Sequence, residues 1–268
     1  MTNYCARKGK YVSIGPTMRI KPFKALRPPA ELAKKVASVP YDTVDTDEAR
    51  ALAAGNPSSF LRIGRPEIDL PAGTDIHSDV VYRQAAENFA EFQKKGYLVR
   101  DDQDSLYVYR LKMGNHVQRG IVACCHIEDY EKDIIRKHEK TRQDKEDDRT
   151  RHVLALNAHS GPIFLTYRDQ AALDKLVTAV EAESPLSDFT SVDGVRHTLW
   201  RIPDAASVVE MFGSVPFAYI ADGHHRAAAA ARAGTQKRRE NPAHTGNEEY
   251  NWFLAVLFPA SQLQILPY

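Results

Sequence analysis

Apolar residues recur with two different periods along the chain. Over residues 75–95 they fall on one helical face and the pattern ends at Gly96, which predicts a long amphipathic helix packed on the core. In residues 106–113 and 117–127 they alternate with polar residues on either side of Gly114-Asn115, which predicts a β-hairpin.

Shorter apolar runs, separated by proline, glycine and polar clusters, predict further elements. The expected strands are 18–26, 162–167, 195–202, 215–221, 252–258 and 263–266. The expected helices are 28–37, 45–54, 169–183, 203–212 and an alanine-rich helix after Gly223. Strands and helices in this mixture predict an α+β protein with a mixed sheet and flanking helices. We expect one region over residues 1–268, with a division into 1–100 and 101–268 left open.

Charge and composition narrow the class of partners. The 36 Lys and Arg nearly balance the 35 Asp and Glu, so no broad field attracts nucleic acid or a membrane. No apolar run approaches the roughly 20 residues of a membrane span, and residues 1–10 lack the apolar core of a secretory signal. Cys5, Cys124 and Cys125 form an odd set, so we expect reduced thiols and a cytoplasmic location.

The densest chemistry lies at the expected strand-to-helix junction. Asp222-Gly223 ends the strand, and His224, His225 and Arg226 then occupy the first turn of the helix. Unpaired N–H groups and the helix dipole favour an anion there, and the planar guanidinium of Arg226 suits phosphate oxygens. Asp222 cannot bind the anion directly, so we expect it to hold a metal ion, orient a histidine or accept a proton.

A second chemical stretch is the charged run over residues 136–152. Such a run is usually a solvated helix face laced by charge pairs. Lys140 and Arg149 could instead hold phosphates, while Thr141 and carboxylates such as Glu139 could serve Mg²⁺ or a substrate hydroxyl. A functional role requires this run to fold back beside Asp222.

The junction also resembles a known signature. Residues 219–226, Tyr-Ile-Ala-Asp-Gly-His-His-Arg, are similar to the signature of a bacterial and archaeal family of unknown function that is described as ParB-like. Further similar segments are 39–42, 56–61, 138–141 with 148–149, 161–164 and 263–268. The resemblance implies a ParB/sulfiredoxin-like fold, in which a Gly-x-His-Arg-like turn holds nucleotide phosphates, and a chain that continues beyond Tyr268. Some of the wider relatives are kinases of free serine.

Three functions follow from these residues. The first is a phosphotransferase acting on a small hydroxyl compound such as free serine, with ATP or ADP and Mg²⁺; Asp222, His224 and Glu139 would be catalytic, and Asp222 would hold the metal ion. The second is a ParB-like nucleotide-binding switch or scaffold without catalysis; no basic recognition helix follows the signature, which disfavours nucleic acid as the partner. Sulfiredoxin-like repair is set aside because His224 stands where it needs a thiol. Homodimer formation is left open.

Overall fold

The computed structural model describes residues 17–264, in which nine strands form one mixed sheet and two short strands pair separately. The strands of the large sheet are β1 (Ile20–Lys21), β4 (Tyr107–Met113), β5 (His116–His126), β6 (Ile135–Arg136), β7 (Ile163–Tyr167), β8 (Ser187–Thr190), β9 (Arg196–Arg201), β10 (Ala218–Asp222) and β11 (Trp252–Pro259). The separate pair is β2 (Leu26–Arg27) with β3 (Val99–Arg100). The large sheet runs in the order β6-β10-β7-β11-β5-β4-β9-β8, with β1 paired to β5. The predicted α+β class with a mixed sheet is confirmed.

The centre of the sheet is formed by the long β4–β5 hairpin and by β11, the last strand in the described part of the chain. β4 and β5 pair antiparallel with Met113 opposite His116, as the Gly114-Asn115 turn predicts. β11 then pairs antiparallel with β5 and parallel with β7. Gly120 lies against Val256 and Phe258 of β11, so close that a Cβ at this position would clash at 2.6 Å. The absence of a side chain at this position leaves room for the side chains of Val256 and Phe258 against the backbone of β5.

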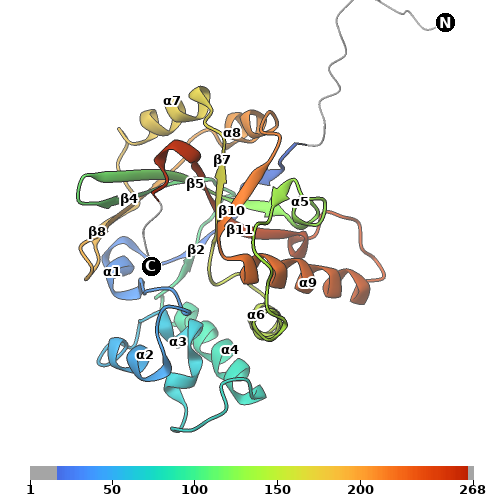
Figure 1. Cartoon of the computed structure of the whole chain (residues 1–268). Coiled ribbons are helices and arrows are strands. Elements are labelled where there is room, and N and C mark those ends of the chain that lie inside the picture. Colours follow the sequence, from blue (N-terminus) through green and yellow to red (C-terminus); the bar gives the residue numbers. More distant parts are fainter. Residues whose placement is uncertain (1–16, 265–268) are drawn as a thin grey trace, which may run out of the picture.

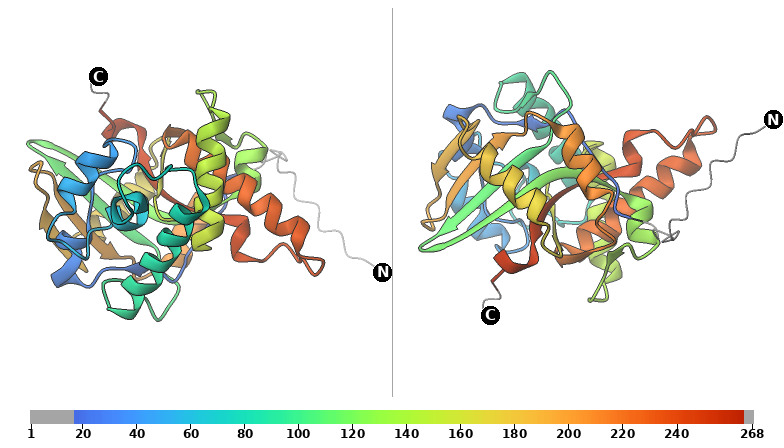
Figure 2. Two further views of the ribbon diagram at one scale, coloured as in Figure 1. Left: turned by 90° about the horizontal axis from the view of Figure 1, so that it is seen from below. Right: turned by 90° about the horizontal axis from the view of Figure 1, so that it is seen from above.

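Helices cover both sides of this sheet and form a separate group beside it (Figure 1). The longer helices are α1 (Ala30–Val36), α2 (Thr46–Leu52), α4 (Asp79–Lys94), α6 (Gln143–Leu156), α7 (Ala171–Val180), α8 (Ala205–Phe212) and α9 (His224–Glu240). The short ones are α3 (Leu61–Gly64), α5 (Ile127–Glu131) and the 3₁₀ turns at Pro66–Asp69, Glu249–Asn251 and Ala260–Gln262. α2, α3 and α4 lie together below the sheet in Figure 1, α7 and α8 above it, and α6 beside α9. Seen from below, α2, α3 and α4 lie in front of the sheet, and seen from above, α7 and α8 do (Figure 2).

Two main apolar clusters hold this arrangement together. The larger one joins the sheet to α7, α8 and the buried alanines of α9. The smaller one lies among α1, α3 and α4 and includes Leu156 from the end of α6. α6 therefore packs at once on α4 and on α9, and connects the N-terminal helices to the helix that carries the signature.

Some elements differ from the sequence prediction. The strand expected over 18–26 is split into β1 and β2, because Pro22 cannot donate a ladder hydrogen bond and Phe23 makes only an isolated bridge. β3, β6, β8 and α5 were not predicted, since elements this short carry little pattern. The strand expected over 263–266 lies partly outside the described residues, and Cys5 and residues 1–10 lie entirely outside them. No helix in residues 17–264 is long and apolar enough to cross a bilayer.

Candidate phosphate-binding site at the start of helix α9

The junction between β10 and α9 is held by one glycine and one arginine. Gly223 adopts φ 93°, a left-handed conformation that most side chains avoid, and a Cβ there would lie 3.1 Å from the Arg226 guanidinium. The Arg226 guanidinium donates to the Pro162 carbonyl and to the Asp222 carboxylate, while its Nε is buried with no partner among the described residues. Arg226 is therefore preorganised at the turn and retains one unused donor.

The segment after β6 folds over the start of α9. Glu139 Oε2 lies 3.2 Å from Nδ1 of His224, and the His138 ring packs edge-on against His224 with centroids 4.4 Å apart. The backbone N–H of Arg142 donates to Nε2 of His225 over 3.2 Å. The charged run thus lies against His224 and His225 at the start of α9, and none of these three contacts is with Asp222 itself.

His224 is the buried member of this group. Only 4% of the residue is exposed, and its Nε2 has no partner among the described residues. Burial lowers the pKa of His224, the neighbouring His138 lowers it further, and Glu139 and Asp222 oppose the shift. His224 is thus biased toward the neutral imidazole, with Nδ1 toward Glu139 and Nε2 as a bare proton acceptor.

Arg149 reaches the same region from α6. Its guanidinium pairs with Asp148 at 2.6 Å and stacks 4.1 Å above the ring of Tyr41, which lies in the loop between α1 and α2. Burial raises the pKa of Tyr41, while the charges of Arg149 and Arg226 lower it. The Tyr41 hydroxyl therefore lies in the field of both arginines.

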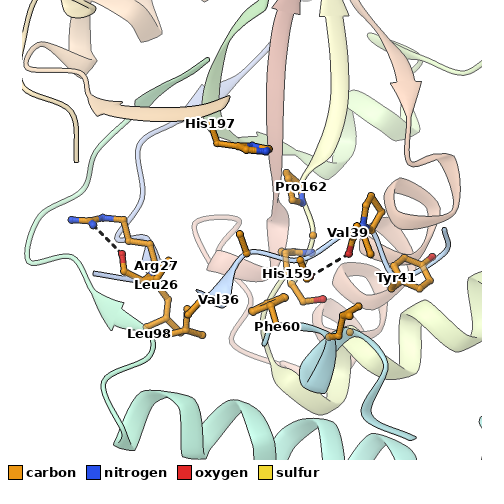
Figure 3. Close-up of a pocket in the computed structure, with 18 of the residues that line it drawn as sticks. Leu26, Arg27, Val36, Val39, Tyr41, Phe60, Leu98, His159, Pro162 and His197 are labelled. Atoms are coloured by element: carbon orange, nitrogen blue, oxygen red, sulfur yellow. Dashed lines mark hydrogen bonds between the residues drawn. The ribbon is translucent and has the colours of Figure 1, made fainter. Parts of the chain in front are cut away.

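Arg226 and Arg149 line one cavity of about 580 Å³ between the N-terminal helices and the sheet. Its wall is mostly apolar, with Leu26, Val36, Phe60 and Leu98 from the N-terminal side and His197 from β9 (Figure 3). The Gly161-Pro162 loop, which leads into β7, forms the wall nearest Arg226, and His159 also lines the cavity. We name this space the main cavity. A mostly apolar cavity of this size with a few charged groups is typical of a small-molecule site.

The other predicted site residues are exposed to solvent or already engaged with protein partners. Lys140 is exposed, and Thr141 donates its hydroxyl to Glu146, so that hydroxyl is already engaged. The Asp222 carboxylate is 66% exposed and forms an ion pair with Arg226. Within residues 17–264, no three His, Cys, Asp or Glu side chains are arranged to hold a metal ion. Of the predicted site residues, Arg226 and Arg149 line the main cavity, whereas the three predicted catalytic residues, Asp222, His224 and Glu139, are not part of its lining. Glu139 contacts His224 beside the cavity.

Sequence reasoning missed Tyr41 and the loop over residues 159–162. Both contribute to the main cavity, and both fall in or beside segments noted only for their family resemblance. An aromatic residue after Val-Pro and a small loop before a strand are ordinary features, so residue type alone carried no signal. Their role depends on long-range packing against α6 and α9.

Comparison with known sequences assigns the family. The sequence model of the family described as "Protein of unknown function (DUF1015)" matches residues 20–268. The chain therefore belongs to this family, whose description gives no activity. Searches of curated proteins and of solved structures found no match.

Proposed function

We propose that the protein is a nucleotide-dependent phosphotransferase that acts on a small hydroxyl compound, with free serine as a candidate acceptor. One observation carries the proposal: Arg226 of the signature and Arg149 of the charged run line a single cavity, in which Arg149 stacks on Tyr41. Two guanidinium groups suit phosphate oxygens, and the apolar wall suits a nucleobase. The resemblance of the signature to the nucleotide-binding turn of ParB/sulfiredoxin-like proteins supports the same assignment.

Phosphoryl transfer needs positioning and charge neutralisation more than a protein nucleophile. The acceptor hydroxyl oxygen would form a bond to the terminal phosphorus of ATP or ADP, and the bond from that phosphorus to the bridging oxygen would break. The nucleotide leaves one phosphate shorter. The hydroxyl proton passes to Asp222 or His224, which flank Arg226 without lining the main cavity, so the acceptor would bind at the Arg226 end of that cavity. Mg²⁺ carried in with the nucleotide would neutralise phosphate charge. Asp222, which pairs with Arg226, is the carboxylate that would hold this ion.

Thermal shift against a nucleotide panel with Mg²⁺ tests the binding step. A nucleotide at about 100 times its dissociation constant should stabilise the protein by about 2.7 kcal/mol. Arg226→Met should weaken that binding by about 1.5–3 kcal/mol, the range for a hydrogen bond to a charged group. Arg239→Met, in the last turn of the same helix, is the matched control and should bind as the wild type does. Equal nucleotide affinity in folded Arg226→Met protein would contradict the phosphate role.

A nucleotide-binding switch without catalysis is the second candidate. The ion pair between Asp222 and Arg226 favours it, because a carboxylate that pairs with Arg226 can stabilise the turn without taking part in catalysis. Transfer of labelled phosphate to serine and related compounds separates the two. In a kinase, Asp222→Asn or His224→Gln should lower turnover by about 10²–10⁴-fold, the usual contribution of a general base, with little change in nucleotide affinity. Tight nucleotide binding with no transfer to any acceptor would favour the switch.

A further inference from the structure

The main cavity has a charged end and an apolar end. At the charged end lie the guanidinium groups of Arg226 and Arg149, with Tyr41 stacked on Arg149. The aliphatic side chains of Leu26 and Leu98 line the opposite end (Figure 3). A ligand that fills this space is therefore anionic at one end and apolar at the other.

His159 lies between these two ends, in the loop from α6 to β7 (Figure 3). Three residues later, the Pro162 carbonyl accepts from the Arg226 guanidinium, which connects this loop to the charged end. The Nε2–H of His159 donates to the carbonyl of Trp252, at the start of β11, over 3.1 Å. The imidazole is thus held in the middle of the cavity by a contact with the backbone of the sheet.

The second nitrogen of His159 is free. A carbonyl oxygen can only accept, so Nε2 carries the proton and Nδ1 keeps its lone pair. Burial lowers the pKa of His159 to about 4, and the ring is therefore neutral at pH 7. Nδ1 makes no hydrogen bond to any described residue, and unlike Nε2 of His224 it is not fully enclosed by protein. His159 therefore offers the cavity one bare hydrogen-bond acceptor.

The other histidine drawn in Figure 3 has no such free nitrogen. Nδ1 of His197 lies 2.5 Å from the Tyr109 hydroxyl, and its Nε2 lies 2.9 Å from the Ser191 hydroxyl. His197 thus contributes a flat, rigid surface, whereas His159 contributes a hydrogen-bonding group that a ligand can use.

Resting on the proposed function, we propose that Nδ1 of His159 accepts a hydrogen bond from a ribose hydroxyl, so that the main cavity selects ribonucleotides over deoxyribonucleotides. In a ribonucleotide the ribose lies between the phosphates and the base. The cavity has the matching order, with the arginines, then His159, then the aliphatic wall. A hydroxyl is a donor that suits a bare lone pair, and an analogue that lacks it leaves this acceptor unpaired in a partly buried site.

Three nucleotides test for the ribose contact. ATP, 2′-deoxy-ATP and 3′-deoxy-ATP, each with Mg²⁺, differ only in the hydroxyl that is present. Titration calorimetry should show at least one deoxy analogue binding about fivefold to tenfold more weakly than ATP, the upper part of the range for a neutral hydrogen bond.

Substitutions then assign the preference to His159. His159→Phe keeps a ring but has no acceptor, so it should bind ATP as weakly as the disfavoured analogue and should bind that analogue as the wild type does. His159→Asn, whose amide oxygen can take the place of Nδ1, should retain part of the preference. His244→Phe, in an exposed loop outside the main cavity, is the matched control and should leave every affinity unchanged.

The outcomes separate this proposal from the proposed function. Equal binding of ATP and both deoxy analogues to the wild type overturns the ribose contact, as does a folded His159→Phe protein that binds ATP and the analogues equally less well. If either result is found while phosphate transfer persists, the phosphotransferase stands without this contact. If binding depends on the ribose hydroxyl and on His159 but no phosphate is transferred to any acceptor, the ribonucleotide site stands and the phosphotransferase is excluded.

Discussion

Gly223 sets the geometry of the whole signature because its left-handed backbone turns the chain and its missing side chain leaves room for Arg226. Gly223→Ala should destabilise the protein by about 1–2 kcal/mol through backbone strain and should also displace the guanidinium. We therefore expect lower nucleotide affinity as well as a lower free energy of unfolding. Urea unfolding and nucleotide titration measure the two effects separately.

Gly194 provides the matched control for this substitution. It adopts φ 82° in the turn between β8 and β9, but a Cβ at this position would have no atom within 4 Å. Gly194→Ala should therefore show a similar loss of stability with unchanged nucleotide affinity. If Gly223→Ala also kept full nucleotide affinity, the close contact with Arg226 would have no bearing on ligand binding.

Among the helices, α6 makes the most consequential long-range connection, and His152 is central to it. Its Nε2–H donates to the Ile63 carbonyl at 2.8 Å, and 2% of the residue is exposed. Burial lowers the pKa of His152 to about 4, and Arg149 contributes in the same direction. The unfolded chain binds a proton near pH 6.5, so the contribution of His152 to stability is complete above that pH and is lost as the pH falls toward 4.

His152→Gln should remove this pH dependence. Between pH 7.5 and 5.0 we expect the wild type to lose about 2 kcal/mol through His152 alone, and the variant to lose about that much less. Glutamine can still donate to Ile63, so the variant should fold with reduced stability at pH 7.5. Urea unfolding at the two pH values gives the comparison, and NMR titration of the wild-type imidazole gives an independent check. Protonation of folded His152 near pH 6.5 would show the idea to be wrong.

Elements with strong local signals could be predicted from sequence. The capping box between Asp45 and Glu48 starts α2, the alternation around Gly114-Asn115 gives the β4–β5 hairpin, and Gly96 ends α4 with φ 70°. β6 and β8 could not, since a two- to four-residue edge strand exists only through its pairing with β10 or β9. Their formation is decided by tertiary contacts, which single-sequence patterns do not contain.

The residues of the candidate site fall into the same two groups: some could be predicted from local sequence, and others depend on tertiary contacts. The signature residues could be identified because a buried strand, a turn and a helix compress them into one short stretch. The contact of Glu139 with His224 could be stated only as a requirement, because a charged run has the same composition whether it faces solvent or a histidine. Tyr41 gave no chemical signal at all, and acquires one only where Arg149 of α6 packs against its ring.

At the scale of the whole molecule, the N-terminal helices and the sheet enclose the main cavity but have separate apolar clusters. A buried carboxylate links them. Asp101 follows β3 and accepts the Tyr107 hydroxyl of β4 at 2.6 Å, while Arg27 of β2 and Arg201 of β9 pair with it at 2.9 and 3.1 Å. The short β2–β3 pair is thereby fixed to the large sheet at the edge of the cavity.

Asp101→Asn should loosen that link without removing either cluster. Two guanidinium groups would lose their shared carboxylate, so we expect a loss of about 3 kcal/mol, at the low end for a broken buried pair because both arginines stay partly exposed. Asp102→Asn is the matched control, since the neighbouring carboxylate is 88% exposed and should be nearly neutral. Hydrogen exchange should rise in α1 to α4 while β5, β7 and β11 stay protected, and nucleotide affinity should fall because one wall of the main cavity is less well held. Uniform exchange across the chain would instead mean that the helices and the sheet unfold as one unit. It would contradict the expectation, based on their separate apolar clusters, that they open independently.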